Sequence, residues 1–286
     1  MKNKEINVIE KISKIENKYS TFLIDLWGVV HNGIEIFPDI LDVLEKLKKN
    51  EKKIIFITNA PRRAMVIERQ LTEFGINRNL YSKVISSGEI TWRYLFDNYK
   101  EKKISLLHIG PPRDDHLING LSYEKVDEPQ KAEILINTGP WGDYDKLENY
   151  KDLLNESLKC KLPMICSNPD KTVIRGEKFM ICAGKLAEYY EENGGSVKYF
   201  GKPYPEIYNF IFTEMKNLNK KKILIIGDSL ENDIKGANLQ KCDSLLISNG
   251  IHREKNNKLG NIPKNLYNLI ALKKIYPNFI SYNLSW

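Results

Sequence analysis

The sequence contains few of the residues that mark a disulfide-stabilised or zinc-binding protein. Among its 286 residues, only four are cysteines and four are histidines. No two cysteines form a C-x-x-C pair, and none has a histidine at the spacing of a zinc site. This pattern argues against a disulfide framework and against structural zinc, and reduced thiols in a cytoplasmic protein are the simplest account of it.

Long apolar runs are also missing. The first 20 residues are polar and rich in lysine, so they lack the apolar centre of a signal peptide. No stretch approaches the ~20 apolar residues of a membrane span. Basic and aromatic residues are not interleaved as they are on nucleic-acid-binding surfaces. We therefore expect neither a membrane nor a nucleic acid as partner, and the net charge of +7 suits a small anionic substrate.

The residues that are present predict an α/β fold. Hydrophobic residues make up 42% of the chain and charged residues 28%, which is typical of a packed globular protein. Short apolar runs at 21–24, 53–57 and 222–226 read as buried strands, and helical patterns alternate with such runs along the chain. This alternation predicts parallel sheets covered by helices. Isoleucines at every third position over 6–15 predict an additional amphipathic helix at the N-terminus.

Polar residues follow several of the predicted strands or stand at strand-to-helix junctions. They are Asp25, Thr58, Asn59, Lys202, Asp228 and Asp233. Each alone is most simply a helix cap, a turn or a surface charge. Because parallel strands gather functional groups beyond their carboxyl ends, the combination instead predicts a shared site.

These residue types suit phosphoryl transfer. A carboxylate can attack a phosphoryl group and form an acyl phosphate. Both partners are negatively charged, so the reaction needs positive charge nearby. A magnesium ion held by carboxylates supplies it, and a hydroxyl and a lysine can hold the remaining phosphate oxygens.

Several segments resemble the motifs of a known superfamily. Four segments resemble, in chain order, the four motifs of the haloacid dehalogenase (HAD) superfamily: Asp25–Val30, Ile57–Asn59, Gly201–Pro205 and Gly227–Asp233. The segment Cys166–Asp170 is similar to a short motif of the class IIA, NagD-like subgroup. The first motif also resembles a branch of that subgroup with Asp-x-Trp-Gly at this place. The resemblance covers residues 21 to 250, most of the chain.

The resemblance implies a two-domain architecture. A Rossmann-like core with a doubly wound parallel sheet would carry the motifs, and an α/β cap of the C2 type would be inserted between the second and third motifs. We assign residues 1–86 and 197–286 to the core and 87–196 to the cap. A homodimer is a possible oligomeric state of such a protein.

The resemblance also implies a metal site. Asp25 would be the nucleophile and a ligand of Mg²⁺, the expected cofactor. Asp228 would be a second ligand, and Asp233 would support the metal directly or through water. The backbone carbonyl of Trp27 would be a further ligand.

Three further residues would contact the substrate. Thr58 and Asn59 would bind phosphate oxygens, and Lys202 would be a catalytic residue that balances the charge on the nucleophile and the phosphate. The implied function is a magnesium-dependent phosphatase that acts on a small phosphorylated metabolite through an aspartyl-phosphate intermediate.

One position departs from the superfamily pattern. The usual phosphatase motif has a second aspartate two residues after the nucleophile, where it acts as general acid and base, and this chain has Trp27 instead. His31 is the nearest candidate in sequence to replace it, although a hydrogen-bonded loop histidine is the simpler interpretation. The alternative function is a weakly catalytic or non-catalytic HAD protein that binds a phosphorylated ligand or a protein partner.

Two patterns from other protein classes are weaker. Gly227–Leu230 reads Gly-Asp-Ser-Leu, as in GDSL esterases, but those enzymes carry it near the N-terminus and have an Asp-x-x-His sequence near the C-terminus. Asp228 to Asp233 could begin a calcium loop, but the central glycine and the final glutamate are absent.

Overall fold

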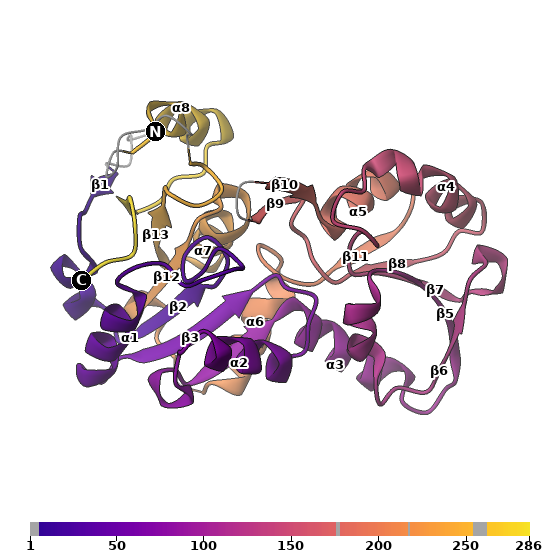
Figure 1. The fold of residues 1–286 in the computed structure, drawn as a ribbon, viewed down its shortest axis with the longest axis horizontal. Helices are drawn as coiled ribbons and strands as arrows, with labels where there is room; N and C mark the ends of the chain where they lie inside the picture. The colour runs from indigo at the N-terminus through magenta and orange to yellow at the C-terminus, as the bar shows by residue number, and fades with distance from the viewer. Residues whose placement is uncertain (1–5, 176–177, 217, 254–261) are drawn as a thin grey trace. The chain divides into compact units, whose positions relative to one another are not determined.

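The computed structural model describes residues 6–175, 178–216, 218–253 and 262–286. The chain forms two compact units (Figure 1). The first comprises residues 1–58, 68–85 and 208–286, and the second comprises 59–67 and 86–207. We call them unit 1 and unit 2 and describe each by itself.

Unit 1 is built on a sheet that contains seven strands among the described residues, in the order β1-β14-β13-β12-β2-β3-β4. The pairs from β1 through to β3 are parallel. The strands are β1 (Asn7–Val8), β2 (Thr21–Asp25), β3 (Lys53–Thr58), β4 (Lys83–Ser86), β12 (Ile223–Gly227), β13 (Asp243–Ile247) and β14 (Phe279–Ser281). Strands β2 and β12 are buried along their whole length, which explains their continuous apolar sequences.

Amphipathic helices pack against this sheet. In α1 the buried residues are Ile40, Val43, Leu44 and Leu47, the spacing of a single helix face. Near the other end of the chain, α8 contributes Leu266 and Ile270 to a cluster with Leu246 of β13 and Ile280 of β14. The helices that lie wholly or partly in unit 1 are α1 (Ile40–Lys49), α2 (Ala64–Glu73), α6 (Pro205–Glu214), α7 (Lys235–Gln240) and α8 (Lys264–Lys273).

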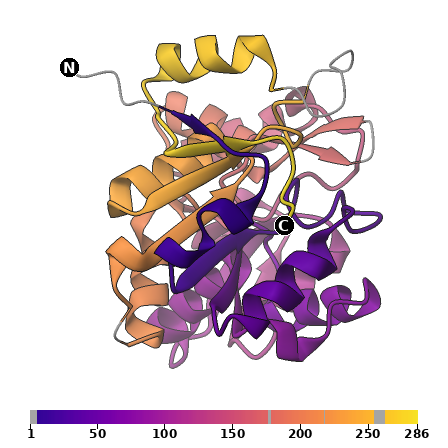
Figure 2. The same cartoon turned by 90° about the vertical axis from the view of Figure 1, so that its left-hand side faces the viewer.

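The predicted N-terminal helix over 6–15 is wrong. The segment forms strand β1, which pairs in parallel with β14 from the far end of the chain (Figure 2). Short 3-10 helices at Ile12–Lys14 and Glu16–Lys18 follow it. The sheet edge provides backbone partners that a local pattern cannot reveal, since Ile9 N–H donates to Ile280 O at 2.9 Å. Ile12 and Ile15 are buried, so the isoleucine spacing reflects tertiary packing.

Unit 2 contains a second parallel sheet, in the order β11-β8-β7-β5-β6, and an antiparallel hairpin of β9 and β10. A core cluster that includes Leu135, Leu154 and Leu186 joins the sheet to α4 and α5. The elements are α3 (Ser87–Tyr99), β5 (Ile104–Ile109), β6 (Tyr123–Val126), β7 (Ile134–Asn137), α4 (Lys151–Lys159), β8 (Met164–Cys166), β9 (Thr172–Arg175), β10 (Lys178–Ile181), α5 (Ala183–Glu192) and β11 (Val197–Tyr199).

The remaining helical elements are short. Seven are of the 3-10 type among the described residues, at Ile12–Lys14, Glu16–Lys18, Arg78–Leu80, Pro112–Ile118, Pro129–Lys131, Leu147–Tyr150 and Lys220–Lys222. A π-helical turn, η8, spans Leu230–Ile234.

The predicted fold class is confirmed: parallel sheets with helices packed against them form a Rossmann-like α/β protein. The four cysteines are free thiols, and burial raises the pKa of the Cys166 thiol to about 12. Within the described part of the chain, every helix is too short or too polar to span a bilayer.

Candidate active site

Three carboxylates meet at one edge of the sheet in unit 1. Asp25 is the last residue of β2, and Asp228 directly follows β12, the strand paired in parallel with β2. Asp233 lies in the π-helical turn that begins two residues after Asp228. One oxygen of each carboxylate lies within 4.8 Å of the others, and all three residues are buried. The sheet register therefore brings together residues about 200 positions apart in the chain.

Glycines allow the backbone to pack closely against two of these carboxylates. A Cβ atom at Gly28 would stand 2.0 Å from Asp228 Oδ2, and one at Gly250 would stand 2.2 Å from the same atom. A Cβ atom at Gly227 would stand 2.0 Å from the Asp233 carboxyl carbon. Side chains at these three positions would displace the carboxylates. Gly28 also has a φ of +84°, which favours glycine for a second reason.

Backbone amides fix how the two carboxylates point. Ile251 N–H donates to Asp228 Oδ2 at 2.7 Å, and Ser229 N–H donates to Asp233 Oδ2 at 3.1 Å. Three buried carboxylates repel one another unless a cation or protons offset their charge. Oxygen ligands fixed around one point suit a hard divalent cation such as Mg²⁺. The donor set therefore fits the predicted metal.

Trp27 belongs to a tight loop directly after β2. A Cβ atom at Gly33 would stand 2.3 Å from Trp27 Cη2, so the indole ring lies over the backbone of Gly33, where φ is +87°. His31 is buried between Trp27 and Phe74, with ring centroids 5.4 Å and 5.2 Å away. Its Nδ1 accepts a hydrogen bond from Gly33 N–H at 3.1 Å. The ring that replaces the usual aspartate is thus part of the packing of this loop.

Thr58 is placed beside the carboxylates by the sheet. It is the last residue of β3, and the register pairs the preceding residue, Ile57, with Asp25. Its side chain is buried. Unit 1 therefore brings together four of the predicted site residues, Asp25, Thr58, Asp228 and Asp233, at the carboxyl ends of three neighbouring strands.

Two further predicted residues, Asn59 and Lys202, lie together in unit 2. The Asn59 side chain accepts a hydrogen bond from Lys202 N–H at 2.7 Å and donates one to Lys202 O at 3.0 Å. It also donates to Asp170 Oδ1 at 2.8 Å. Asn59 and Lys202 are both buried. This arrangement links the second motif, the third motif and the Ser-Asn-Pro-Asp segment.

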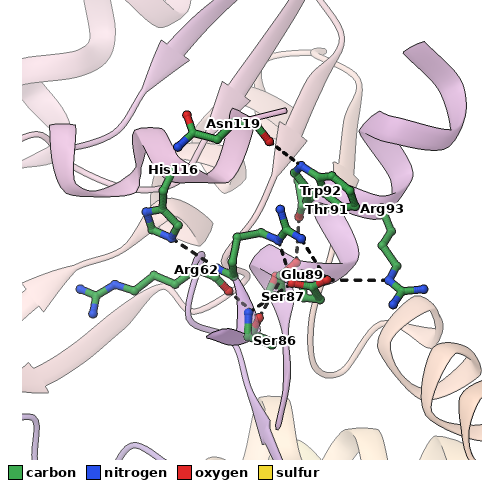
Figure 3. A network of polar contacts seen from close by, with 11 residues as sticks. Arg62, Ser86, Ser87, Glu89, Thr91, Trp92, Arg93, His116 and Asn119 are labelled. Atoms are coloured by element: carbon green, nitrogen blue, oxygen red, sulfur yellow. Dashed lines mark hydrogen bonds and ion pairs between the residues drawn. The ribbon is translucent and has the colours of Figure 1, made fainter. Parts of the chain in front are cut away.

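The segment after Asn59 is fastened to the start of α3. Figure 3 shows Ser86 and Glu89 of this region beside Arg62 and His116. Glu89 accepts hydrogen bonds from Arg63 Nε at 2.8 Å and from the Ala64 N–H at 3.2 Å. His116 Nε2 accepts a hydrogen bond from the Arg63 N–H at 3.3 Å. The loop of the second motif is therefore fixed at several points within unit 2.

The Arg63 side chain adds a further contact between this loop and α3. The Arg63 guanidinium lies 3.8 Å from the centre of the Trp92 ring. The Trp92 indole N–H donates to Asn119 O at 2.9 Å (Figure 3). Burial alone would raise the pKa of the Glu89 carboxyl, but the hydrogen bonds from Arg63 and Ala64 and the charges of Arg63 and Arg93 outweigh it and hold this pKa below its ordinary value. Glu89 is thus ionised at neutral pH.

The structure adds contacts that the motifs alone did not reveal. The loop after β13 supplies Gly250 and the Ile251 amide to Asp228. The other site residues were found because small or polar residues follow a predicted strand. The same pattern occurs in this loop, which follows β13. Asp170 marked the subgroup in the sequence, but its bond to Asn59 joins positions 111 apart and gave no local signal.

The chain matches family models over most of the core motifs. Residues 22–123 match the haloacid dehalogenase-like hydrolase model, and residues 199–269 match the HAD-hydrolase-like model. Among curated proteins, the chain is 24% identical over 275 residues to a 4-nitrophenylphosphatase of Schizosaccharomyces pombe, which covers 88% of this chain and 91% of that protein. It is 25% identical over 244 residues to the sugar phosphatase AraL of Bacillus subtilis, covering 83% and 86%.

A solved structure gives the strongest support for the family. A hydrolase of the haloacid dehalogenase-like family from Brucella suis 1330 superimposes with a TM-score of 0.84 at 30% identity, covering 97% of this chain and 100% of that chain. A possible sugar phosphatase from Cytophaga hutchinsonii shares the fold, with a TM-score of 0.78 at 21% identity. The chain therefore belongs to the haloacid dehalogenase superfamily of hydrolases and, as its motifs predicted, to the NagD-like subgroup.

Proposed function

We propose that this protein is a magnesium-dependent phosphatase that hydrolyses a small phosphorylated metabolite through an aspartyl-phosphate intermediate. The observation that carries the proposal is the buried cluster of Asp25, Asp228 and Asp233 in a chain of the HAD superfamily. The relatives named 4-nitrophenylphosphatase and sugar phosphatase support a phosphate ester as the bond that is cleaved.

In the proposed reaction, an Asp25 carboxylate oxygen attacks phosphorus, and the bond between phosphorus and the leaving oxygen breaks. The leaving oxygen takes up a proton from solvent. A water oxygen then attacks the aspartyl phosphate at phosphorus and loses a proton to solvent, and the bond between phosphorus and the Asp25 oxygen breaks. This step releases inorganic phosphate and restores the Asp25 carboxylate. Thr58 and the Asn59 segment would hold phosphate oxygens, and the Lys202 ammonium would offset negative charge on the nucleophile and the phosphate.

The metal would be held by Asp25, Asp228 and Asp233, with the Trp27 carbonyl as the further proposed ligand. A bound magnesium ion supplies positive charge near the phosphate oxygens. The backbone amides of Ile251 and Ser229 orient the carboxylates for this role.

We further propose that the insertion between the second and third motifs, residues 87–196, acts as a cap that selects the substrate, and that 1–86 and 197–286 act as the catalytic core. The parallel sheet and hairpin of unit 2 support an independently folded insertion. The alternative of a weakly catalytic or non-catalytic protein that binds a phosphorylated ligand or a protein partner rests on Trp27, and the enzyme names of these relatives do not favour it.

The test is hydrolysis of a panel of phosphate esters with Mg²⁺, comparing wild-type protein with Asp25→Asn. We expect the substitution to lower the rate by about 10³-fold or more, because it removes the nucleophile. Asp25→Asn should still fold, since it relieves repulsion among three buried carboxylates. Asp42→Asn, an exposed carboxylate on α1, is the matched control and should retain full activity. Near wild-type turnover by Asp25→Asn would refute the proposed mechanism.

A further inference from the structure

The Asn59 carboxamide uses both of its N–H donors inside the protein. One reaches Lys202 O at 3.0 Å and the other reaches Asp170 Oδ1 at 2.8 Å, while Oδ1 accepts from Lys202 N–H at 2.7 Å. A carboxamide has two N–H donors and no more. Phosphate oxygens at neutral pH need donors, so this side chain has none left to offer a phosphate.

We propose that Asn59 and Asp170 form a positioning pair that fixes the backbone of Lys202, and that the Asn59 side chain is not itself a phosphate ligand. The inference rests on the proposed function, because Lys202 is the residue whose charge the reaction would use. It changes the role of Asn59 from direct binding to placement of the lysine.

The geometry of the pair explains why both residues are needed. Asn59 bonds to the N–H and to the C=O of Lys202, so it holds the residue on both sides of its Cα atom. A lysine side chain is a flexible stem with a charge at its tip, and fixing its backbone limits where that charge can lie. Asn59 and Lys202 are 3% and 2% exposed, so water does not compete freely for these bonds.

Asp170 determines which way the carboxamide faces. A carboxylate can only accept hydrogen bonds, so the Asn59 N–H group must point toward it. A carboxamide rotated by 180° would place its oxygen against the Asp170 carboxylate and its N–H group against the Lys202 N–H. Both contacts would be repulsive. Asp170 thereby selects the orientation that matches the backbone of Lys202.

The surrounding chain holds the pair in place. Asp170 N–H donates to Asn168 Oδ1 at 3.0 Å, and Asp170 O accepts from Gly184 N–H of α5 at 3.0 Å. Gly201 has a φ of +127°, and a Cβ atom there would stand 2.6 Å from Asn59 Oδ1 and 2.8 Å from Pro169 Cδ. Only glycine lets the lysine segment lie this close to the carboxamide.

The test measures kcat and KM for 4-nitrophenyl phosphate, and inhibition by inorganic phosphate, in wild-type protein and in Asp170→Ala, Asp170→Asn and Asn59→Ala. We expect Asp170→Ala to lower kcat by about 10- to 100-fold with a smaller change in KM, because a misplaced lysine weakens stabilisation of the transition state more than binding of the substrate. Asp170→Asn keeps an oxygen that can accept from Asn59 and should restore most of the rate. Asn59→Ala should lower kcat at least as far as Asp170→Ala does.

Asn137→Ala is the matched control. Asn137 is also a buried asparagine of unit 2, and its Nδ2 donates to Ala183 O at 3.0 Å. Its loss should lower Tm while kcat and KM stay at wild-type values, which separates placement of the lysine from general destabilisation.

Two outcomes would overturn the inference. One is wild-type kcat in Asp170→Ala. The other is an Asn59→Ala protein with raised KM and weaker inhibition by inorganic phosphate but unchanged kcat, which would make the side chain a direct ligand. A wild-type protein without phosphatase activity would instead overturn the proposed function. The pair would then be judged from a crystal structure of Asp170→Ala, where we expect Asn59 to move and to lose at least one of its hydrogen bonds to Lys202. Unchanged positions of Asn59 and of the Lys202 backbone would refute the pair.

Discussion

At the scale of single residues, Trp27 is the substitution with the largest chemical consequence. An indole N–H is a hydrogen-bond donor only and does not act as a general acid or base at neutral pH, so it cannot replace the usual aspartate in proton transfer. The ring is packed over Gly33 and against His31, so it has become part of the loop. His31 is a packed, hydrogen-bonded loop residue, as the simpler interpretation of its sequence position held.

The missing acid predicts a preference among substrates. General acid–base catalysis typically raises the reaction rate by about 10²–10⁴-fold, and an ester with a good leaving group depends on it least. Aryl phosphates should therefore be cleaved measurably and alkyl phosphates much more slowly, as steady-state rates on matched esters would show. Trp27→Asp should narrow this gap, although loss of the packed ring should also lower Tm.

Replacement of the histidine provides the control for that experiment. His31→Gln should leave the ratio of alkyl to aryl rates unchanged if the loop histidine is not the acid. If the wild-type protein cleaves alkyl and aryl esters equally well, an efficient acid is present and the argument from Trp27 is wrong.

At the scale of elements, the loop between β3 and α2 depends on the start of α3. Arg63 and the Ala64 amide both bind Glu89, so this carboxylate joins a loop to a helix terminus. Its negative charge near the N-terminus of α3 also interacts favourably with the helix dipole.

This contact predicts a pH-dependent stability. Because the pKa of Glu89 is lower in the folded protein, its stabilisation is present above its unfolded pKa and is lost as the pH falls through the folded value. Glu89→Gln should cost roughly 1–3 kcal/mol at pH 7, since it leaves Arg63 without its charged partner. Thermal unfolding should show a difference from wild-type that shrinks toward pH 4. A difference that stays constant with pH would contradict this account.

At the scale of the whole molecule, the buried carboxylates couple stability to metal binding. Asp25, Asp228 and Asp233 repel one another when no cation offsets their charge. A ligand that binds only the folded state stabilises it by about 2.7 kcal/mol at 100 times its Kd.

Magnesium should therefore raise Tm by roughly 5 °C or more at saturating concentration, and a chelator should reverse the change. Asp228→Asn should raise Tm without metal and reduce the response to magnesium, and differential scanning calorimetry would measure both. Asp42→Asn should respond like the wild-type protein. An equal magnesium response in Asp228→Asn would show that the ion binds elsewhere.

The sequence by itself determined the fold class and the candidate metal ligands. Buried parallel strands have continuous apolar sequences, and a carboxylate after such a strand stands at the edge where parallel strands present their functional groups. Asp25 and Asp228 could be found in this way because each signal is local, confined to a strand and the residues that follow it.

Tertiary structure decided the features that depend on distant partners. The isoleucines near the N-terminus have helical spacing, yet the segment forms β1 because the neighbouring strand β14 offers backbone hydrogen bonds. The position of Asn59 in the second motif predicted a phosphate ligand. Only the folded structure revealed that both side-chain N–H donors of Asn59 bind Asp170 and Lys202. A local pattern records which groups a residue carries, and the folded chain decides which partners those groups meet.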